Sequence, residues 1–245
     1  MKRILSGLAV LIALSGCLQN KIKQKPEWNN YIPSGAGTMA LWDNGHNNFE
    51  IFNMQRYRDS AYSPGNTFHA VIALGALQSG VCFSDTSLID GDVTLKDAFI
   101  TGNDSAFISL SQKIGTDTMG LFLDSLSYGN KAMHEGAFWT DSLKLVGDEQ
   151  LGLVKRLYFR QLPFQNRNQE IIRNLAGREK NAAYMLHYLL QPDEPGKTGW
   201  ITGWIEENRH VYFFLINRDH VPGQPALPDL LKKWLADQGF FQGKK

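Results

Sequence analysis

The chain has 245 residues, of which 43% are hydrophobic and 20% are charged. This composition is typical of one compact domain and excludes disorder as the overall state. The formal net charge of +1 gives no overall field strong enough to indicate a nucleic acid or an anionic surface as the partner.

The N-terminus has the pattern of an export signal. A basic "MKR" precedes the apolar run "ILSGLAVLIAL", and "LSGC" follows, ending at Cys17. The apolar run is shorter than the roughly 18 to 20 residues that a membrane-spanning helix needs. "LSGC" resembles a bacterial lipobox, which implies a signal peptide over residues 1–16 and a lipid on the Cys17 thiol. The alternative is an ordinary secretory signal whose apolar run happens to end in Cys.

Residues 17–36 are polar, contain Pro and Gly, and show no sustained period, which predicts a tether between the lipid and a folded domain over 37–245. A lipid on Cys17 would hold the protein on the periplasmic side of a bacterial membrane. Leu18, in place of an Asp, favours the outer membrane. The other cysteine, Cys82, then lacks a disulfide partner, and we expect it to be a small buried hydrophobe.

The first elements of the domain are predicted to be a hairpin and a buried helix. In "TMALWDNGHNNFEIFN", two apolar runs flank Asn44-Gly45, which predicts two antiparallel strands. Between Thr67 and Gln78 the apolar residues recur at helical spacing. Asn66 is the expected N-cap of this helix and Gly80 closes it, and its apolar character predicts burial.

Further along the chain, helical and strand patterns alternate. Periodicity and punctuation predict helices at 94–101, 104–114, 117–127, 148–161 and 167–176. "GWITGWIEE" and "HVYFFLINRD" predict a second hairpin about Asn208-Arg209, and "LPDLLKKWLADQGFF" predicts a terminal helix. The order of elements predicts an α+β fold, with one antiparallel sheet flanked by helices and an all-helical insert.

Six segments in order resemble the class D β-lactamases, a family of penicillin-recognising serine hydrolases with the β-lactamase/transpeptidase-like fold. The segments run from Ala40 to Asn217 and include "SPGNTFHAVIALGALQSG", "DSAFISLSQKIG", "LSYGN", "FWTDSLKL", "EQLGLVKRLYFRQLPF" and "GWITGWIEENRHVYFF". The resemblance implies the family's fold and a cleft for a β-lactam or a peptidoglycan-derived ligand.

The first motif of the family is Ser-Thr-Phe-Lys, in which Ser is the nucleophile and Lys, carbamylated by CO2, is the general base. This chain has "NTFH" there, with Asn66 and His69 at the two positions. A carboxamide nitrogen cannot form the acyl-enzyme, and imidazole cannot form the lysine carbamate. Each residue also has a structural explanation, because Asn66 suits a helix cap and His69 suits a buried hydrogen-bonded position.

The resemblance assigns further candidate site residues. The second motif, Ser-x-Val, corresponds to "SAF" from Ser105 to Phe107, and Ser105 could equally cap the next helix. Tyr128 belongs to an intact "YGN". Trp139 matches the family's Trp that hydrogen-bonds the carbamylated Lys, which here is missing.

The third motif, Lys-Thr-Gly, has two candidate registers. "KTG" occurs at Lys197, Thr198 and Gly199, but it adjoins the "GW..GW" strand directly, where the family has an intervening loop. The alternative places "YMLHYLLQ", residues 184–191, on the family's strand, so that residues 189–191 replace the triplet. We favour the alternative because it preserves the strand and most of the hairpin length.

We therefore expect an inactive β-lactamase-like lipoprotein that keeps the fold and a cleft for a cell-wall-derived ligand or a protein. The alternative is an active hydrolase of β-lactams or peptidoglycan with Ser105 as nucleophile and His69 as base, which requires the two side chains to be hydrogen-bonded. The six His show no pair at zinc-ligand spacing with a carboxylate between them, so we expect no metal and no cofactor.

Overall fold

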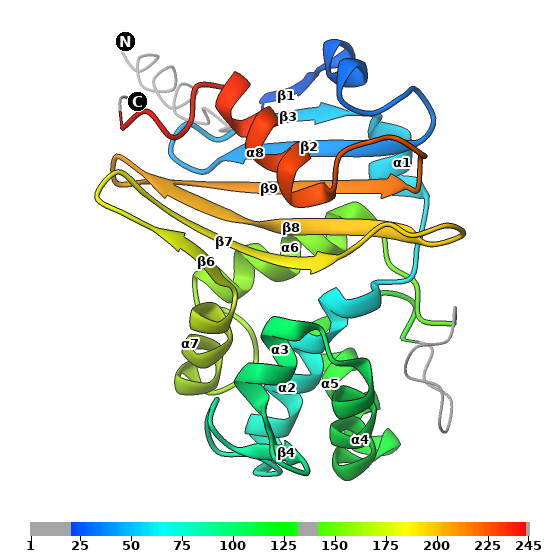
Figure 1. The fold of residues 1–245 in the computed structure, drawn as a ribbon, viewed down its shortest axis with the longest axis vertical. Coiled ribbons are helices and arrows are strands. Elements are labelled where there is room, and N and C mark those ends of the chain that lie inside the picture. Colours follow the sequence, from blue (N-terminus) through cyan, green and yellow to red (C-terminus); the bar gives the residue numbers. More distant parts are fainter. Residues whose placement is uncertain (1–20, 132–141, 244–245) are drawn as a thin grey trace, which may run out of the picture.

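The computed structural model describes residues 21–131 and 142–243, and its central feature is a seven-stranded sheet (Figure 1). The strand order is β1-β3-β2-β9-β8-β7-β6. The neighbours pair antiparallel except for β1, which runs parallel to β3, so the sheet is mixed and not wholly antiparallel. The strands are β1 (Lys21–Gln24), β2 (Gly37–Asp43), β3 (Asn48–Phe52), β6 (Gly177–Lys180), β7 (Tyr184–Gln191), β8 (Thr198–Glu207) and β9 (His210–Asp219).

Both predicted hairpins are present. β2 and β3 flank the Asn44-Gly45 turn, although the residue there with positive φ is Asn47, at 52°. β8 and β9 meet at Asn208 and Arg209, whose φ angles of 54° and 66° are those that a two-residue hairpin turn requires. β8 and β9 read as nearly continuous apolar runs because helices cover both faces of the sheet at these strands.

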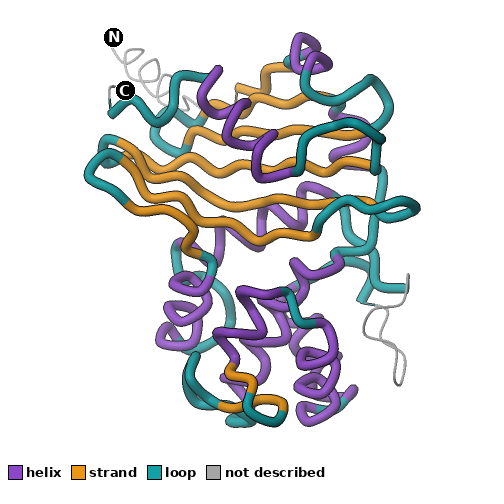
Figure 2. Tube along the Cα trace, in the orientation of Figure 1, coloured by secondary structure: helices purple, strands orange, loops and turns teal. Residues whose placement is uncertain are grey.

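The two faces of the sheet carry different helices (Figures 1 and 2). On one face lie α8 (Leu227–Asp237) and the 3-10 helix η1 (Pro26–Asn30), joined by an edge-on contact of Trp28 with Trp234 at 4.9 Å between ring centroids. α6 (Gly147–Tyr158) packs on the other face, against β8 and β9. The fold is therefore α+β with helices on both faces of the sheet, as the sequence predicts.

A helical lobe extends from the face that carries α6 (Figure 1). It contains α2 (His69–Ser79), α3 (Leu95–Thr101), α4 (Asp104–Ile114), α5 (Thr116–Leu126), α7 (Asn166–Leu175) and a two-stranded ribbon of β4 (Leu88–Asp90) and β5 (Val93–Thr94). Residues 69–77 of α2 are all buried, as the sequence predicts for a central helix. α2 ends at Gly80, whose φ of 75° is the left-handed conformation of a C-cap.

Residues 21–36 correct one expectation. We predicted a tether over 17–36, but β1 pairs with β3, and Trp28 is only 2% exposed between the sheet and α8. A tryptophan that buries this much apolar surface favours docking over a free linker. Cys17 and the signal segment lie outside the described residues. Within the described ranges, none of the helices is long and apolar enough to cross a membrane.

Candidate functional site

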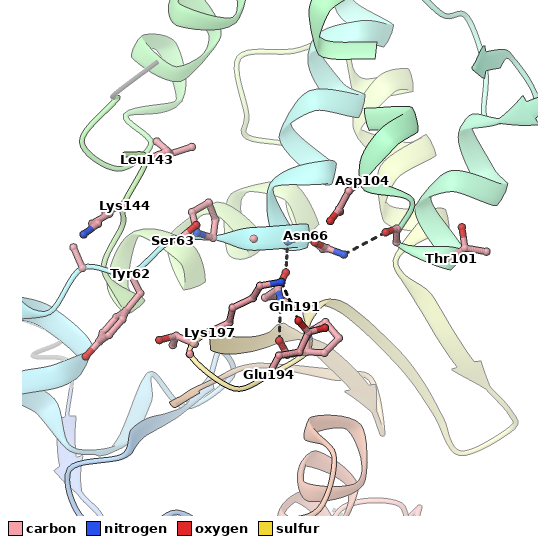
Figure 3. Close-up of a pocket in the computed structure, with 17 residues that line it drawn as sticks. Tyr62, Ser63, Asn66, Thr101, Asp104, Leu143, Lys144, Gln191, Glu194 and Lys197 are labelled. Carbon is pink, nitrogen blue, oxygen red and sulfur yellow. Dashed lines mark hydrogen bonds and ion pairs between the residues drawn. The ribbon is translucent and has the colours of Figure 1, made fainter. Parts of the chain in front are cut away.

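A cavity of about 550 Å³ opens where the sheet meets the helical lobe (Figure 3). Four segments form its walls: the turn before α2, the α3–α4 connection, residues 143–144, and the end of β7 with the loop to β8. These segments are distant in sequence, and the antiparallel pairing of β7 with β8 brings the last of them beside the start of α2. The cavity is thus a product of the tertiary fold.

Asn66 lies on the cavity wall but does not cap a helix in the way we predicted. Pro64 and Gly65 start a 3-10 turn, η2 (Gly65–Phe68), which runs into α2, so Asn66 sits inside this turn. Its side chain instead donates from Nδ2 to the carbonyl of Gly102, at 3.4 Å. The Asn66 side chain therefore links the start of α2 to the α3–α4 connection across the cavity.

The backbone of Asn66 is bound by a side chain of the sheet. Its amide N–H donates to Oε1 of Gln191, the last residue of β7, with an N···O distance of 2.7 Å. Figure 3 shows the Gln191 side chain between η2 and the β7–β8 loop. It also lies over Gly65, because a Cβ on Gly65 would come within 2.2 Å of Oε1. Gln191 thus fills the space directly in front of the helix start.

His69, the first residue of α2, is buried, with 3% of its side chain exposed. Its Nε2 lies 3.1 Å from Oδ1 of Asp104, and its ring stacks on Phe107 with centroids 3.9 Å apart. Burial lowers the pKa of His69, and the neighbouring carboxylate of Asp104 opposes this only in part. The imidazole is therefore a neutral, packed side chain near neutral pH.

Ser105 stands in the first turn of α4 and is exposed, and it is not among the described residues that line the cavity. It is not the cap of α4 either. That role belongs to Asn103, whose side chain accepts from the N–H of Ala106 at 3.1 Å. The residue next to Nε2 of His69 is Asp104, so α4 directs a carboxylate to the imidazole.

Tyr128 and Asn130 organise the loop beyond α5. Tyr128 is buried: its hydroxyl donates to Oε1 of Gln150 at 2.9 Å, and burial raises its pKa. Asn130 exchanges hydrogen bonds with Lys144, from N–H to carbonyl at 2.9 Å and from the Lys144 N–H to Oδ1 at 3.1 Å. These bonds place Lys144 at the cavity, whereas Tyr128 belongs to the core. Trp139 lies outside the described residues.

The "KTG" triplet stands at the opposite wall. Lys197 lies in the β7–β8 loop with 64% of its side chain exposed and contacts Oε2 of Glu194 at 2.9 Å, which raises the pKa of Lys197. Thr198 and Gly199 begin β8. Lys197 and Thr198 line the cavity, and Gln191 lies on the strand next to Asn66. Residues 184–191 form one strand, β7, and Thr198 begins the next, so the replacement of the triplet by residues 189–191 stays a prediction.

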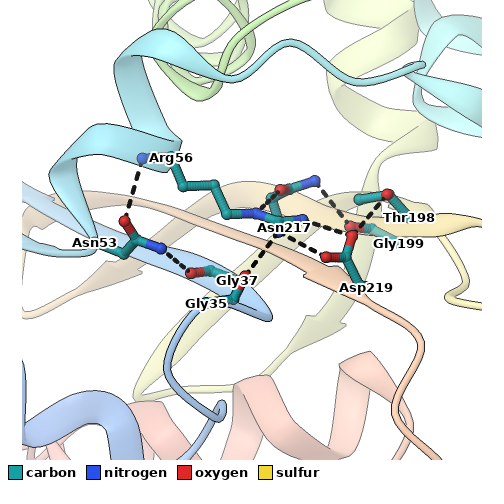
Figure 4. A network of polar contacts seen from close by, with 8 residues as sticks. All are labelled: Gly35, Gly37, Asn53, Arg56, Thr198, Gly199, Asn217 and Asp219. Atoms are coloured by element: carbon teal, nitrogen blue, oxygen red, sulfur yellow. Dashed lines mark hydrogen bonds and ion pairs between the residues drawn. The ribbon is translucent and has the colours of Figure 1, made fainter.

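A polar network holds Thr198 in place (Figure 4). Its Oγ1 donates to Oδ1 of Asp219 at 2.9 Å, and Asp219 forms a two-pronged ion pair with Arg56, with both N···O distances 2.7 Å. The Arg56 Nε also donates to Oδ1 of Asn217 at 2.9 Å. Arg56 lowers the pKa of Asp219, so this carboxylate stays ionised and is a weak base.

Several cavity residues were not predicted as site residues, and the charged ones among them are Asp104, Lys144 and Glu194, whereas Gln191 belonged to the favoured register of the third motif. Asp104 directly precedes the Ser of "SAF", and Gln191 ends the predicted strand "YMLHYLLQ", so the motif registers carried a signal for both. Lys144 and Glu194 had no such signal, because each stands in a loop whose path depends on contacts made elsewhere in the chain.

Comparisons of sequence relate the chain to β-lactamases. No family model matches it. β-Lactamase OXA-5 of Pseudomonas aeruginosa is 26% identical, and the match covers 99% of this chain and 100% of that protein. Regulatory protein BlaR1 of Bacillus licheniformis is also 26% identical, over 78% of this chain and 34% of that longer protein.

Solved structures give the same result for the fold. FUS-1 (OXA-85), a class D β-lactamase from Fusobacterium nucleatum subsp. polymorphum, superposes with a TM-score of 0.76 at 25% identity, covering 85% of this chain and 93% of that one. The class D β-lactamase BAT-2 superposes with a TM-score of 0.76 at 22% identity, covering 86% and 94%. The arrangement of sheet and helical lobe is therefore the class D β-lactamase fold.

Proposed function

We propose that this homologue of the class D β-lactamases is a lipoprotein that binds a cell-wall-derived ligand, or a β-lactam that resembles one, without hydrolysing it. The ligand would occupy the cavity between η2 and the β7–β8 loop. Three features support binding without turnover: the hydroxyls at the cavity, the state of the backbone N–H groups, and the charges on the walls.

The hydroxyls give little nucleophilic potential. Asn66 has none, and a carboxamide is not a nucleophile for acyl transfer. The described residues that line the cavity and bear a hydroxyl are Tyr62, Ser63, Thr101 and Thr198, and of these only Thr198 is hydrogen-bonded to a carboxylate. That carboxylate, Asp219, is held ionised by Arg56 and cannot act as an effective base. Ser105 and His69, the alternative pair, are respectively exposed and stacked beside Asp104.

The hydrogen bond from the Asn66 N–H to Gln191 is the observation that carries the proposal. Acyl transfer needs backbone N–H donors aimed at the oxygen on which negative charge develops, and losing one donor costs about 10² to 10³ in rate. The donor at the start of the helix is already bound to Oε1 of Gln191. The next residue along the wall is Pro192, which has no N–H. Neither of these two described positions therefore offers a free N–H to a ligand oxygen.

The cavity walls retain groups that suit a polar ligand. Lys144 and Asp104 lie on opposite sides of the opening, and Lys197 and Glu194 form an ion pair in the β7–β8 loop (Figure 3), so the site offers charges of both signs. A peptide-like ligand with an amine and a carboxylate would complement them. The relative BlaR1 is named as a regulatory protein, which supports a role for this fold other than hydrolysis.

The membrane anchor is a separate part of the proposal. Cys17 would carry the lipid and hold the domain on the periplasmic side, with the outer membrane favoured by Leu18. Feeding the producing bacterium an alkyne-labelled fatty acid should label the protein, and Cys17→Ser should abolish the label. Cys82→Ser is the matched control and should keep it, because Cys82 is buried in the core. Label on the Cys17→Ser protein would contradict the anchor.

Turnover and binding test the main claim together. We expect the native protein to leave a chromogenic cephalosporin intact, to gain no covalent mass from benzylpenicillin, and to bind benzylpenicillin or muropeptides reversibly in calorimetry. The double variant Asn66→Ser/His69→Lys should also stay inactive, because Gln191 still holds the Asn66-position N–H. Ready hydrolysis by the native protein would overturn the proposal. If none of these ligands gave a binding heat in calorimetry, the claim that the protein binds them would be contradicted.

A further inference from the structure

A second cavity, of about 300 Å³, adjoins the first. The two share lining residues at the start of α2, in the α3–α4 connection and after β7, namely Asn66, Thr101, Gly102 and Pro192. The second cavity continues along β7 towards β6, between the C-terminal end of α3 and the strand. A ligand longer than the first cavity would therefore enter the second one past Gly102.

The second cavity has apolar walls and one cation. Phe99, Ile100, Leu189 and Leu190 are its apolar lining residues, and Ile100 is 55% exposed. Arg178, on β6, is the one lining residue among those described that carries a permanent charge. An apolar surface that ends in a single guanidinium is complementary to an apolar group that bears an anion.

Arg178 has the surroundings of a binding residue rather than of a structural ion pair. Its guanidinium lies over the ring of Tyr188, 5.0 Å from the centroid, and burial lowers its pKa. None of the ion pairs among the described residues includes Arg178. The acidic groups on adjacent elements are engaged elsewhere, since Glu179 pairs with Lys232 and Glu170 pairs with Arg173.

A partly buried guanidinium without a carboxylate partner is costly, because burial removes water from a charge that nothing else neutralises. The potential around it is positive: Arg173 and Arg178 both contribute, after burial, to the low pKa of His187 on β7. An anion in the second cavity would offset this cost, because it would form charge-assisted hydrogen bonds with the Arg178 guanidinium. The planar fork of a guanidinium can donate to both oxygens of a carboxylate, and we take a carboxylate as the anion.

We propose that Arg178 forms a carboxylate subsite, in which the second cavity binds the acidic end of an N-acyl amino acid or peptide whose apolar part lies against Phe99 and Leu190. The subsite rests on the proposed function, because it extends the same binding cleft. It specifies the ligand class: an amphiphilic chain that ends in a carboxylate, threaded from the first cavity along β7.

The probes that test the subsite are N-acetylphenylalanine and its carboxamide, which differ in the terminal charge. Their affinities would be measured by calorimetry on the purified full-length protein in a non-ionic detergent. The native protein should prefer the acid by at least about tenfold, the value of a charge-assisted hydrogen bond. Arg178→Gln should remove the preference, and Arg178→Lys should restore part of it. Lys180→Gln, which removes an exposed charge from the same strand outside the cavity, should leave the preference unchanged.

Three results would overturn the subsite: equal affinity of the native protein for acid and amide, binding of neither probe, or a preference that survives in Arg178→Gln. Benzylpenicillin binding, measured on the same samples, distinguishes a failure of the Arg178 subsite from a failure of the proposed function. If benzylpenicillin binds while the acid shows no preference, the subsite alone fails. If the acid is preferred while neither benzylpenicillin nor a muropeptide binds, the proposed function fails and the anion site stands.

Discussion

Gly65 and Gln191 occupy each other's space. The φ of Gly65 is +51°, and a Cβ added there would lie 2.2 Å from Oε1 and 2.5 Å from Cδ of Gln191. The missing side chain at 65 is what allows Gln191 to reach the N–H of Asn66. The two residues are 126 positions apart in the sequence, yet together they decide whether the start of α2 is open or filled.

The first prediction is an energetic coupling between these residues. Gly65→Ala should lower the free energy of unfolding by about 3 kcal/mol. The new Cβ would clash with Gln191, and alanine is also strained at the positive φ of this position. In a Gln191→Ala background the same change should cost only about 1 kcal/mol, since the strain remains and the clash is gone. Urea unfolding of the four proteins gives the coupling directly. Equal costs in both backgrounds would show that the two residues do not compete for this space.

A second prediction concerns the ligand. Gln191→Ala should tighten reversible binding of benzylpenicillin by up to about tenfold, because a ligand carbonyl can then accept from the Asn66 N–H. Hydrolysis should stay absent, since no nucleophile is added. Calorimetry gives the affinity, and Gln161→Ala, an exposed glutamine outside the cavity, is the control. Weaker or unchanged binding in Gln191→Ala would mean that Gln191 does not obstruct the ligand.

The third prediction addresses the support of Thr198. Asp219→Ala should destabilise the protein by about 3 kcal/mol, because it leaves the buried Arg56 without its two-pronged partner. Asp237→Ala removes an exposed carboxylate that contacts Lys233 and Tyr31, and it should destabilise the protein much less. Urea unfolding compares the two. Similar losses for both variants would argue against a structural role for the Arg56–Asp219 pair.

The fourth prediction is a pH dependence from His187. Burial, with the positive charges of Arg173 and Arg178, lowers its pKa from 6.5 to about 4. Between pH 6.5 and 4 the unfolded chain binds the proton more strongly than the folded protein does. The contribution of His187 to the free energy of unfolding is therefore fully present above pH 6.5 and is lost as the pH falls towards 4. His187→Phe keeps the stacking on Trp204 and removes the proton site. Its unfolding free energy, measured from pH 4.5 to 7.5, should fall less steeply than that of the parent. Identical slopes would contradict the assignment.

Much of the fold was readable from local patterns. The two hairpins, α2 and the helices α3 to α8 lie within a few residues of their predicted positions, because apolar periodicity and Gly, Asn and Pro punctuation act over short distances. The caps were less readable. Asn66 and Ser105 both have side chains that can cap, but the Pro64-Gly65 turn displaced the first, and Asn103 took the role of the second.

The sequence by itself determined that Asn66 and His69 stand at the start of the buried helix α2, and the prediction that these are the positions of the family's nucleophile and base rests on the motif alone. Only the tertiary structure decided what surrounds them. The pairing of β7 with β8 brings Gln191 to the Asn66 N–H, and α4 brings Asp104 to His69. β6 places Arg178 in the adjoining cavity. These contacts join residues that lie tens to more than a hundred positions apart in the sequence. Contacts between such distant residues are determined by packing and strand register rather than by local propensity.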